Sequence, residues 1–173
     1  MITDVCRALV CMHARNWVHA DLKPCNVVMS AKHFKLIDFG LSELMESEQI
    51  SEGVQLEMSK GTSFYKAPEV FDEEWRLYGQ FTDMWGVGVM AFLMMGLRHP
   101  ISDFMRTTDP KKNIGNIGLN ESFVHSQYSA DLQVLVYRMI STDHRNRPSA
   151  EEVLRHKFLY IDVEVDRKAL FNE

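Results

Sequence analysis

The 173-residue chain lacks the features of several large protein classes. Its longest uncharged apolar stretch, residues 84–97, is too short to cross a membrane. Its three cysteines, Cys6, Cys11 and Cys25, are too few and too clustered for a disulfide framework, which favours a reducing compartment. It also lacks an excess of positive charge, because 19 Lys and Arg oppose 24 Asp and Glu. The net charge of −5 disfavours nucleic acid and anionic membrane surfaces as partners.

The composition is that of a folded domain, with 46% hydrophobic and 25% charged residues. No repeat, low-complexity stretch or linker divides the chain. We therefore expect one domain over residues 1–173, in a cytoplasmic protein, with the nucleus as the alternative location.

Helical spacing of apolar residues dominates the pattern. Apolar residues between Ile2 and Met12 recur on one face, and Asn16 follows as a candidate end of that helix. Asp83 is interpreted as the cap of a second helix, which runs to Leu97 and is apolar on all sides. A third helix is expected from Ser129. The pair Ser149 and Glu152 forms a capping box for a last helix.

The expected β-structure is small. Val27–Met29 and Lys35–Ile37 are short apolar runs separated by a polar stretch, which predicts a hairpin. Residues 38–62 have no sustained period and are interpreted as a loop, and one short helix is expected near residues 102–107. The fold class is therefore mainly α with a minor β-hairpin.

The residues of greatest chemical interest stand in and after the segment Val18–Asn26. Asp21, Lys23 and Asn26 lie within six positions, and Asp38 follows twelve residues after Asn26. Phosphoryl transfer needs an aspartate that orients a hydroxyl and accepts its proton, together with oxygen ligands for Mg²⁺. It also gains from a cation near the transferred group, where negative charge develops.

The chain resembles the C-terminal lobe of the eukaryotic protein kinases. The catalytic-loop segment 18–26 and Asp38–Gly40 are similar to the family's first two signatures. Residues 61–69 resemble its substrate-binding segment, Asp83–Gly88 the start of its buried central helix, and Arg145–Pro148 the segment before its last helices. Asp21-Leu22-Lys23-Pro24 and Gly61-Thr62 look like the Ser/Thr-specific branch.

The resemblance implies a role for each matched position. Asp21 would be the catalytic base and Lys23 would contact the γ-phosphate of ATP. Asn26 and Asp38 would bind Mg²⁺, and Val28 would form part of the floor under the adenine. The cofactors implied are ATP and Mg²⁺, and the partner is a protein substrate.

The resemblance also implies structural roles. Thr62 would touch Asp21 and Lys23, Glu69 with Arg147 would form a buried ion pair, and Asp83 would tie the catalytic loop to the core helix. The implied segments are the catalytic loop 19–26, the activation segment 38–69, the core helix 83–97, the C-terminal helices 129–158 and a short tail 159–173.

The chain departs from the family pattern in two ways. A kinase places a Gly-rich loop, a strand lysine and a helix glutamate before the catalytic loop, but residues 1–20 contain no Gly, Lys or Glu. We therefore expect the C-terminal lobe without an N-lobe, either as a fragment or as a free-standing half. Ala20 stands where the motif usually has Arg, the residue that receives an activation-loop phosphate. Loop phosphorylation is accordingly not expected to control this protein.

Three functions are compatible with these residues. The first is a protein Ser/Thr kinase that transfers the γ-phosphate of Mg-ATP to a protein hydroxyl. The second is a catalytically silent docking module that engages a substrate, an N-lobe or a partner kinase in trans. The third is a small-molecule phosphotransferase, against which residues 61–69 and 83–88 argue because they resemble peptide-kinase segments.

Individual residues also leave alternatives open. His19 is interpreted as a packed, hydrogen-bonded histidine and not as a general base. Cys25 is either a passive small side chain or a thiol activated by Lys23. The glutamates between Glu43 and Glu57 form either a solvated loop or a steering surface for basic substrates.

Overall fold

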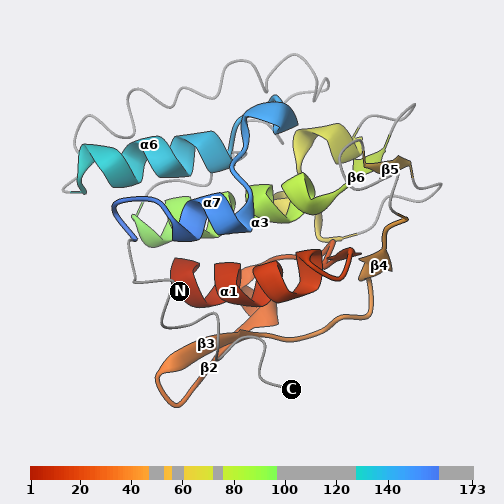
Figure 1. The fold of residues 1–173 in the computed structure, drawn as a ribbon, viewed down its shortest axis with the longest axis horizontal. Coiled ribbons are helices and arrows are strands. Elements are labelled where there is room, and N and C mark those ends of the chain that lie inside the picture. Colours follow the sequence, from red (N-terminus) through yellow and green to blue (C-terminus); the bar gives the residue numbers. More distant parts are fainter. Residues whose placement is uncertain (47–52, 56–60, 72–75, 97–127, 160–173) are drawn as a thin grey trace.

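The computed structural model describes residues 1–46, 53–55, 61–71, 76–96 and 128–159. Within these ranges, four α-helices form the body of the protein: α1 (Ile2–His13), α3 (Gln80–Met94), α6 (Ala130–Met139) and α7 (Ala150–Leu154). In Figure 1, α6 lies on one side of α3, and α1 lies on the other side. The expected mainly helical composition is confirmed for these ranges.

Helix α3 is the centre of the hydrophobic core. Every residue from Thr82 to Phe92 is buried, as expected for a helix that is apolar on all sides. The helix begins at Gln80 with Gly79 as its N-cap, so the interpretation of Asp83 as the cap was wrong. Asp83 lies inside the first turn, where its carboxylate is only 1% exposed and is available to other segments.

Helix α1 buries one face, as its apolar spacing predicted. Val5, Cys6 and Leu9 are fully buried against the core, and the helix packs on α7, α3 and a strand of the hairpin. The chain reverses after the helix at Asn16, whose φ of 62° is a left-handed conformation that asparagine tolerates well. This reversal directs the following residues back along α1 and toward α3.

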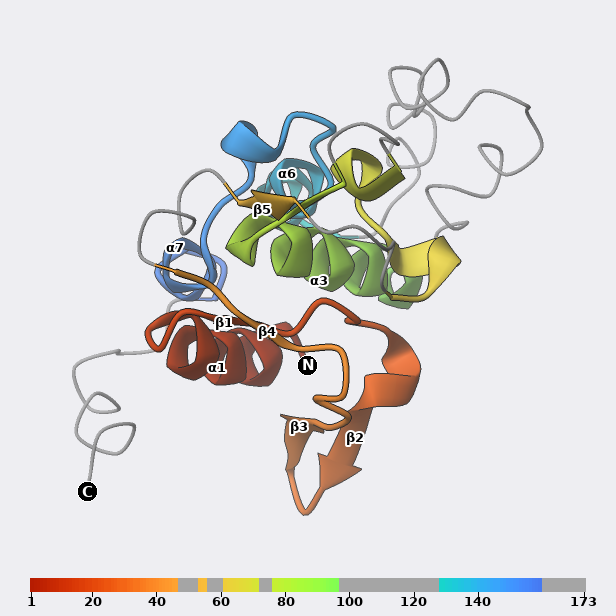
Figure 2. The ribbon, with the colours of Figure 1, turned by 90° about the vertical axis from the view of Figure 1, so that its right-hand side faces the viewer.

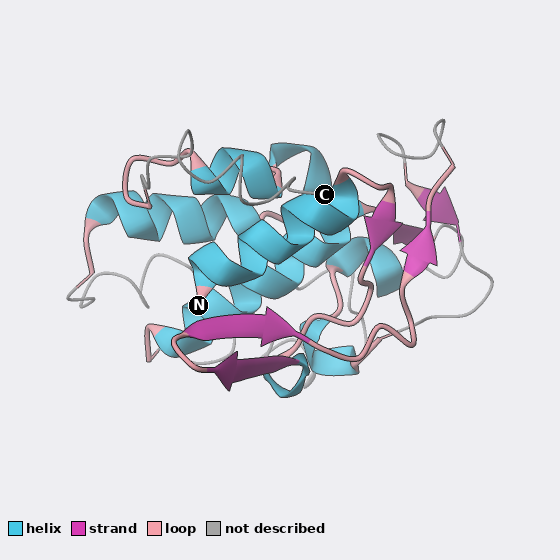
Figure 3. Cartoon of the chain, turned by 60° about the horizontal axis from the view of Figure 1, so that its bottom comes forward, coloured by secondary structure: helices cyan, strands magenta, loops and turns pink. Residues whose placement is uncertain are grey.

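The described strands form three two-stranded antiparallel sheets at the margin of the helices (Figure 3). The predicted hairpin is confirmed as β2 (Val27–Ser30) and β3 (His33–Leu36), with Val27 opposite Leu36. In Figures 1 and 2 this hairpin projects from the α1 side of the molecule. Its backbone is tied to α1 because Asp4 Oδ2 accepts a hydrogen bond from Phe34 N at 3.0 Å.

The interpretation of residues 38–62 as loop alone was wrong in two places. Strand β4 (Glu43–Leu44) pairs with β1 (Trp17–Val18), and β5 (Val54–Gln55) pairs with β6 (Leu77–Tyr78). Two-residue strands carry too little sequence for an alternating pattern to emerge, so pairing partners far along the chain define them.

The last helices begin as predicted. Ser129 Oγ accepts a hydrogen bond from Leu132 N at the start of α6. Ser149 and Glu152 exchange both bonds of a capping box at α7. The helix expected near residues 102–107 lies outside the described residues. In the described ranges, no helix combines the length and the apolar character that a membrane span requires.

Candidate active site

The expected catalytic loop, residues 19–26, is held in place by one buried carboxylate of α3. Asp83 Oδ2 accepts a hydrogen bond from His19 N at 2.9 Å, and Asp83 Oδ1 accepts one from Ala20 N at 3.0 Å. His13 Nε2 at the end of α1 lies 2.9 Å from Asp83 Oδ2. Asp83 therefore joins three segments that are far apart in sequence, which agrees with the tie to the core helix that the resemblance implied.

Residues 61–69, called the substrate-side segment below because they resemble a substrate-binding segment, approach this loop through Gly61. Gly61 has a φ of +83°, and a Cβ at this position would lie 2.7 Å from the carbonyl oxygen of Ala20. Both features require glycine here, because a larger residue would be strained and would also collide with backbone. The close approach brings the next residue, Thr62, onto the catalytic loop.

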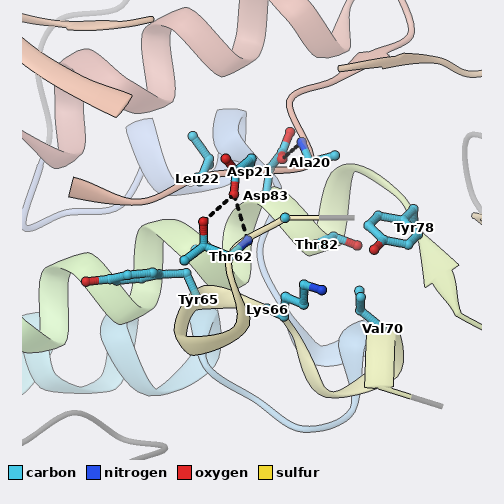
Figure 4. Close-up of a pocket in the computed structure, with 12 residues that line it drawn as sticks. Ala20, Asp21, Leu22, Thr62, Tyr65, Lys66, Val70, Tyr78, Thr82 and Asp83 are labelled. Atoms are coloured by element: carbon cyan, nitrogen blue, oxygen red, sulfur yellow. Dashed lines mark hydrogen bonds between the residues drawn. The ribbon is translucent and has the colours of Figure 1, made fainter. Parts of the chain in front are cut away.

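Asp21 is the meeting point of the site (Figure 4). Its Oδ1 accepts hydrogen bonds from Thr62 N at 2.8 Å and Thr62 Oγ1 at 3.0 Å. Its Oδ2 accepts from Lys23 Nζ at 2.6 Å and Asn26 Nδ2 at 3.2 Å. Lys23 Nζ also donates to Thr62 Oγ1 at 2.8 Å. The structure thus brings the predicted residues Asp21, Lys23 and Asn26 together with Thr62.

These contacts set the charge state of the site. Partial burial acts to raise the pKa of Asp21, but hydrogen bonds from Lys23 and Thr62 outweigh it and hold the pKa below its usual value. The hydrogen bond to Asp21 raises the pKa of Lys23. Both groups are therefore ionised at neutral pH, and the carboxylate is oriented by fixed donors.

A backbone hydrogen bond joins the segments that carry the two predicted metal ligands, Asn26 and Asp38. Ile37 N, one residue before Asp38, donates to Asn26 O at 3.0 Å. Asn26 uses Nδ2 toward Asp21, so its Oδ1 is the atom suited to a cation. Among the described residues, no group of three or more His, Cys, Asp and Glu side chains forms a metal cage. One carboxylate and one carboxamide fit Mg²⁺, which commonly completes its coordination with water and substrate phosphates.

Val28 lies on β2 with 37% of its side chain exposed. An exposed apolar side chain beside Asn26 is compatible with the predicted place under an adenine ring. Asp38 is also exposed and adopts a left-handed φ of 62°. Its Oδ1 lies 3.4 Å from Gly40 N.

One further predicted contact, the pair of Glu69 and Arg147, stabilises the substrate-side segment. Arg147 donates to Glu69 through both terminal nitrogens, at 2.6 and 2.7 Å. The Arg147 side chain is fully buried, donates to Phe81 O at 3.0 Å and lies 5.0 Å from the ring centre of Trp85. This agrees with the buried ion pair that the resemblance implied.

His19 and Cys25 occupy contrasting environments. The His19 side chain is buried, with Nε2 3.3 Å from Ile37 O and its ring 5.4 Å from that of Phe39. This environment agrees with a packed histidine and not with a general base. Cys25 is exposed, and both interpretations of its thiol remain predictions.

Sequence reasoning missed two residues of the site. His13 pairs with Asp83, but in sequence it is only the last residue of an amphipathic helix. Lys66 lines the pocket beside Asp21, although in sequence it is one unassigned position inside a motif. His13 and Asp83 are 70 positions apart in the chain. Lys66 and Asp21 belong to different loop segments. Neither placement leaves a signal in the local sequence.

The comparisons with known proteins agree with this geometry. A family model described as the protein kinase domain matches residues 1–159. The chain belongs to the protein kinase family. It is 33% identical to mouse serine/threonine-protein kinase DCLK3 over 166 residues, which cover 92% of this chain and 20% of that protein. It is 29% identical to mouse death-associated protein kinase 2, over 86% of this chain and 40% of the relative.

A solved structure described as the twitchin kinase region from C. elegans has the same fold. It is 28% identical, with a TM-score of 0.69, over 92% of this chain and 28% of that one. The chain thus spans less than half the length of each of these three proteins.

Proposed function

We propose that this chain is the C-terminal lobe of a protein serine/threonine kinase, which transfers the γ-phosphate of Mg-ATP to a protein hydroxyl. The observation that carries the proposal is the orientation of the Asp21 carboxylate by four donor atoms, which belong to Lys23, Asn26 and Thr62. This carboxylate lies where the catalytic loop meets the substrate-side segment. The names of the relatives, all protein kinases, support the same reaction class.

In the proposed reaction, Asp21 orients the substrate hydroxyl and accepts its proton as the oxygen attacks phosphorus. Lys23 Nζ lies beside the base and stabilises negative charge on the transferred group. Asn26 and Asp38 would hold Mg²⁺, which neutralises phosphate charge and aligns the nucleotide when it is bound. Thr62 contacts both Asp21 and Lys23, so it couples the substrate-side segment to the base.

The central test replaces Asp21 with Asn. A carboxamide of nearly the same shape cannot take the hydroxyl proton, and loss of such a base typically lowers the rate by about 10²- to 10⁴-fold. Radiolabelled phosphate transfer to a generic protein substrate is measured for the chain alone and with an ATP-binding lobe of a relative added in trans. Asp131→Asn, at an exposed surface carboxylate, is the matched control. Undiminished transfer by Asp21→Asn would remove Asp21 from the role of base.

A second function, a silent docking module, is favoured by exposed apolar side chains close in sequence to Asn26 and Asp38, the residues proposed to hold Mg²⁺. Val28, Met29, Ile37 and Phe39 are 37%, 72%, 39% and 53% exposed. Contiguous exposed apolar surface is typical of a site that another protein covers. The outcome that separates the two functions is stable binding of an N-lobe in trans without any phosphate transfer, which supports the docking module alone.

A further inference from the structure

A cavity outside the proposed active site lies where three helices meet. It has a volume of about 210 Å³ and is bounded by the end of α1, the start of α3 and the start of α7. In Figures 1 and 2, α7 lies beside α1. Of the described residues, none lines both this cavity and the pocket that holds Asp21. Sites for drug-sized ligands typically measure about 300–1,000 Å³, so this cavity suits a smaller molecule.

His13 connects the cavity to the catalytic loop. Its side chain lines the cavity, is only 7% exposed and places Nε2 2.9 Å from Asp83 Oδ2. Because the carboxylate accepts, Nε2 carries a proton, and Nδ1 is then an acceptor in the neutral ring. In the described part of the chain, Nδ1 has no hydrogen-bond partner. A buried histidine with one unsatisfied nitrogen beside a cavity is suited to receive a donor from a ligand.

Two other side chains of the lining also offer acceptor atoms. Gln80 Nε2 donates to His13 O at 3.1 Å, which leaves Gln80 Oε1 as an acceptor. Arg155 contacts Oε2 of Glu151 at 3.1 Å, which leaves Oε1 for a second donor. Of the described residues that line the cavity, Glu151 is the one Asp, Glu, Lys or Arg. The fixed charge of the lining is therefore negative, which favours a cation with several N–H donors over an anion.

We propose that this cavity binds a small primary amine in its ammonium form and that the bound ammonium stabilises the catalytic loop. An ammonium group has three N–H donors. These match the three acceptors of the lining, which are His13 Nδ1, Gln80 Oε1 and Glu151 Oε1. The short carbon chain of the amine contacts the apolar part of the lining, which is formed by Val10, Ala14 and Ala150.

The bound amine acts on the loop through hydrogen bonds that already exist. A donor at Nδ1 of His13 keeps the ring proton on Nε2, and this is the tautomer that donates to Asp83. Asp83 in turn accepts from His19 N at 2.9 Å and from Ala20 N at 3.0 Å. None of these contacts involves the Asp21 carboxylate, so binding of the amine does not depend on the proposed transfer of phosphate.

The test titrates the 173-residue chain with n-butylammonium at fixed pH and follows the binding by NMR. The signals are the ¹⁵N shift of His13 Nδ1 and the backbone amides of His19 and Ala20. Three further probes separate the contributions to binding. Butan-1-ol keeps a donor without the charge, tetramethylammonium keeps the charge without an N–H donor, and butyrate reverses the charge.

We expect n-butylammonium to bind with a dissociation constant of about 1 mM. Butan-1-ol and tetramethylammonium should bind about fivefold more weakly, and butyrate should bind least. The amides of His19 and Ala20 should shift with the same apparent affinity as His13 Nδ1. Butyrate or tetramethylammonium bound as tightly as n-butylammonium, no saturable binding of the amine, or loop amides that stay in place at saturation would overturn the inference.

Two variants locate the bound amine. Glu151→Gln removes the carboxylate of the lining and should weaken binding about threefold. Ala14→Leu fills part of the cavity and should abolish binding. Asp131→Asn is the matched control, because Asp131 also lies in the first turn of a helix, also pairs with a cation and is 48% exposed against 55% for Glu151.

Unchanged binding in Glu151→Gln, or an equal loss in Asp131→Asn, would place the amine elsewhere and overturn the inference. This comparison stands even if Ala14→Leu fails to fold, since Glu151 is a surface residue. Asp21→Asn separates this proposal from the proposed function. It should abolish phosphate transfer and leave the affinity for n-butylammonium unchanged.

Discussion

Asp21 and Asp83 are both buried carboxylates, yet their contacts give them different tasks. Asp83 accepts backbone N–H groups of the catalytic loop, so its interactions are complete within the protein. Asp21 accepts hydrogen bonds from Lys23 and Thr62 at the end of the loop, and the proposed function gives it a chemical role there. The difference follows from their positions, since one lies in a core helix and the other in a loop that the helix holds.

The pair of Glu69 and Arg147 is a residue-scale contact whose loss we expect to be costly. Glu69→Gln would leave the fully buried Arg147 guanidinium without its carboxylate. Removal of one partner from a buried pair typically lowers the free energy of unfolding by about 3–5 kcal/mol. Urea titration followed by circular dichroism measures this change.

The matched control is Glu151→Gln, because Glu151 pairs with Arg155 on the surface and both side chains are more than half exposed. Exposed pairs at this helical spacing contribute about 0.3–0.5 kcal/mol. Similar losses in Glu69→Gln and Glu151→Gln would contradict a special role for the buried pair.

At the scale of elements, two glycines let α3 contact different neighbours. A Cβ at Gly86 would lie 2.7 Å from Leu22 Cβ in the catalytic loop. A Cβ at Gly88 would lie 2.7 Å from Ile140 Cγ2 and 2.8 Å from Met139 Cβ at the end of α6. The two positions share one helix, so they have the same gain in helix propensity on substitution by Ala.

We expect Gly86→Ala and Gly88→Ala each to lower the free energy of unfolding. Overpacking costs about 1–3 kcal/mol, which exceeds the propensity gain of about 1 kcal/mol. Only Gly86→Ala should also reduce phosphate transfer, since it displaces the loop that carries Asp21. Thermal unfolding and transfer assays measure both effects. Equal losses of transfer in the two variants would contradict the expectation that only Gly86 positions the loop that carries Asp21.

Local patterns predicted the elements whose signals are local. The α1 face, the β2–β3 hairpin and the capping box at Ser149 each depend on residues within a few positions of one another. The start of α3 was misjudged, because Asp83 has the residue type of a cap but is used by the catalytic loop. The bonds that Thr62 makes to Asp21, and the place of Lys66 in the pocket beside it, depend on how separate segments are positioned, which no local pattern contains.

At the scale of the whole molecule, the residues proposed to bind Mg-ATP are close in sequence to exposed apolar side chains. Asn26 and Asp38 supply oxygen atoms, and Phe39 and Met29 nearby in sequence are more than half exposed. Apolar side chains of this size are normally buried against a neighbour. Under the proposed function, a kinase N-lobe would cover these side chains when ATP is bound.

This arrangement predicts that the 173-residue chain alone binds Mg-ATP poorly. Under the proposed function, Lys23, Asn26 and Asp38 would contact the γ-phosphate and Mg²⁺, but residues 1–20 contain no Gly-rich loop or strand lysine for the other phosphates. Val28 would form one side of an adenine site, and burial of a single face gives a small part of the affinity that an enclosed pocket provides. Calorimetric titration of the chain with ATP and Mg²⁺ should therefore give a dissociation constant weaker than about 100 μM, near −5.5 kcal/mol. Addition of an ATP-binding lobe in trans should tighten it, and low-micromolar binding by the chain alone would show that this lobe is sufficient.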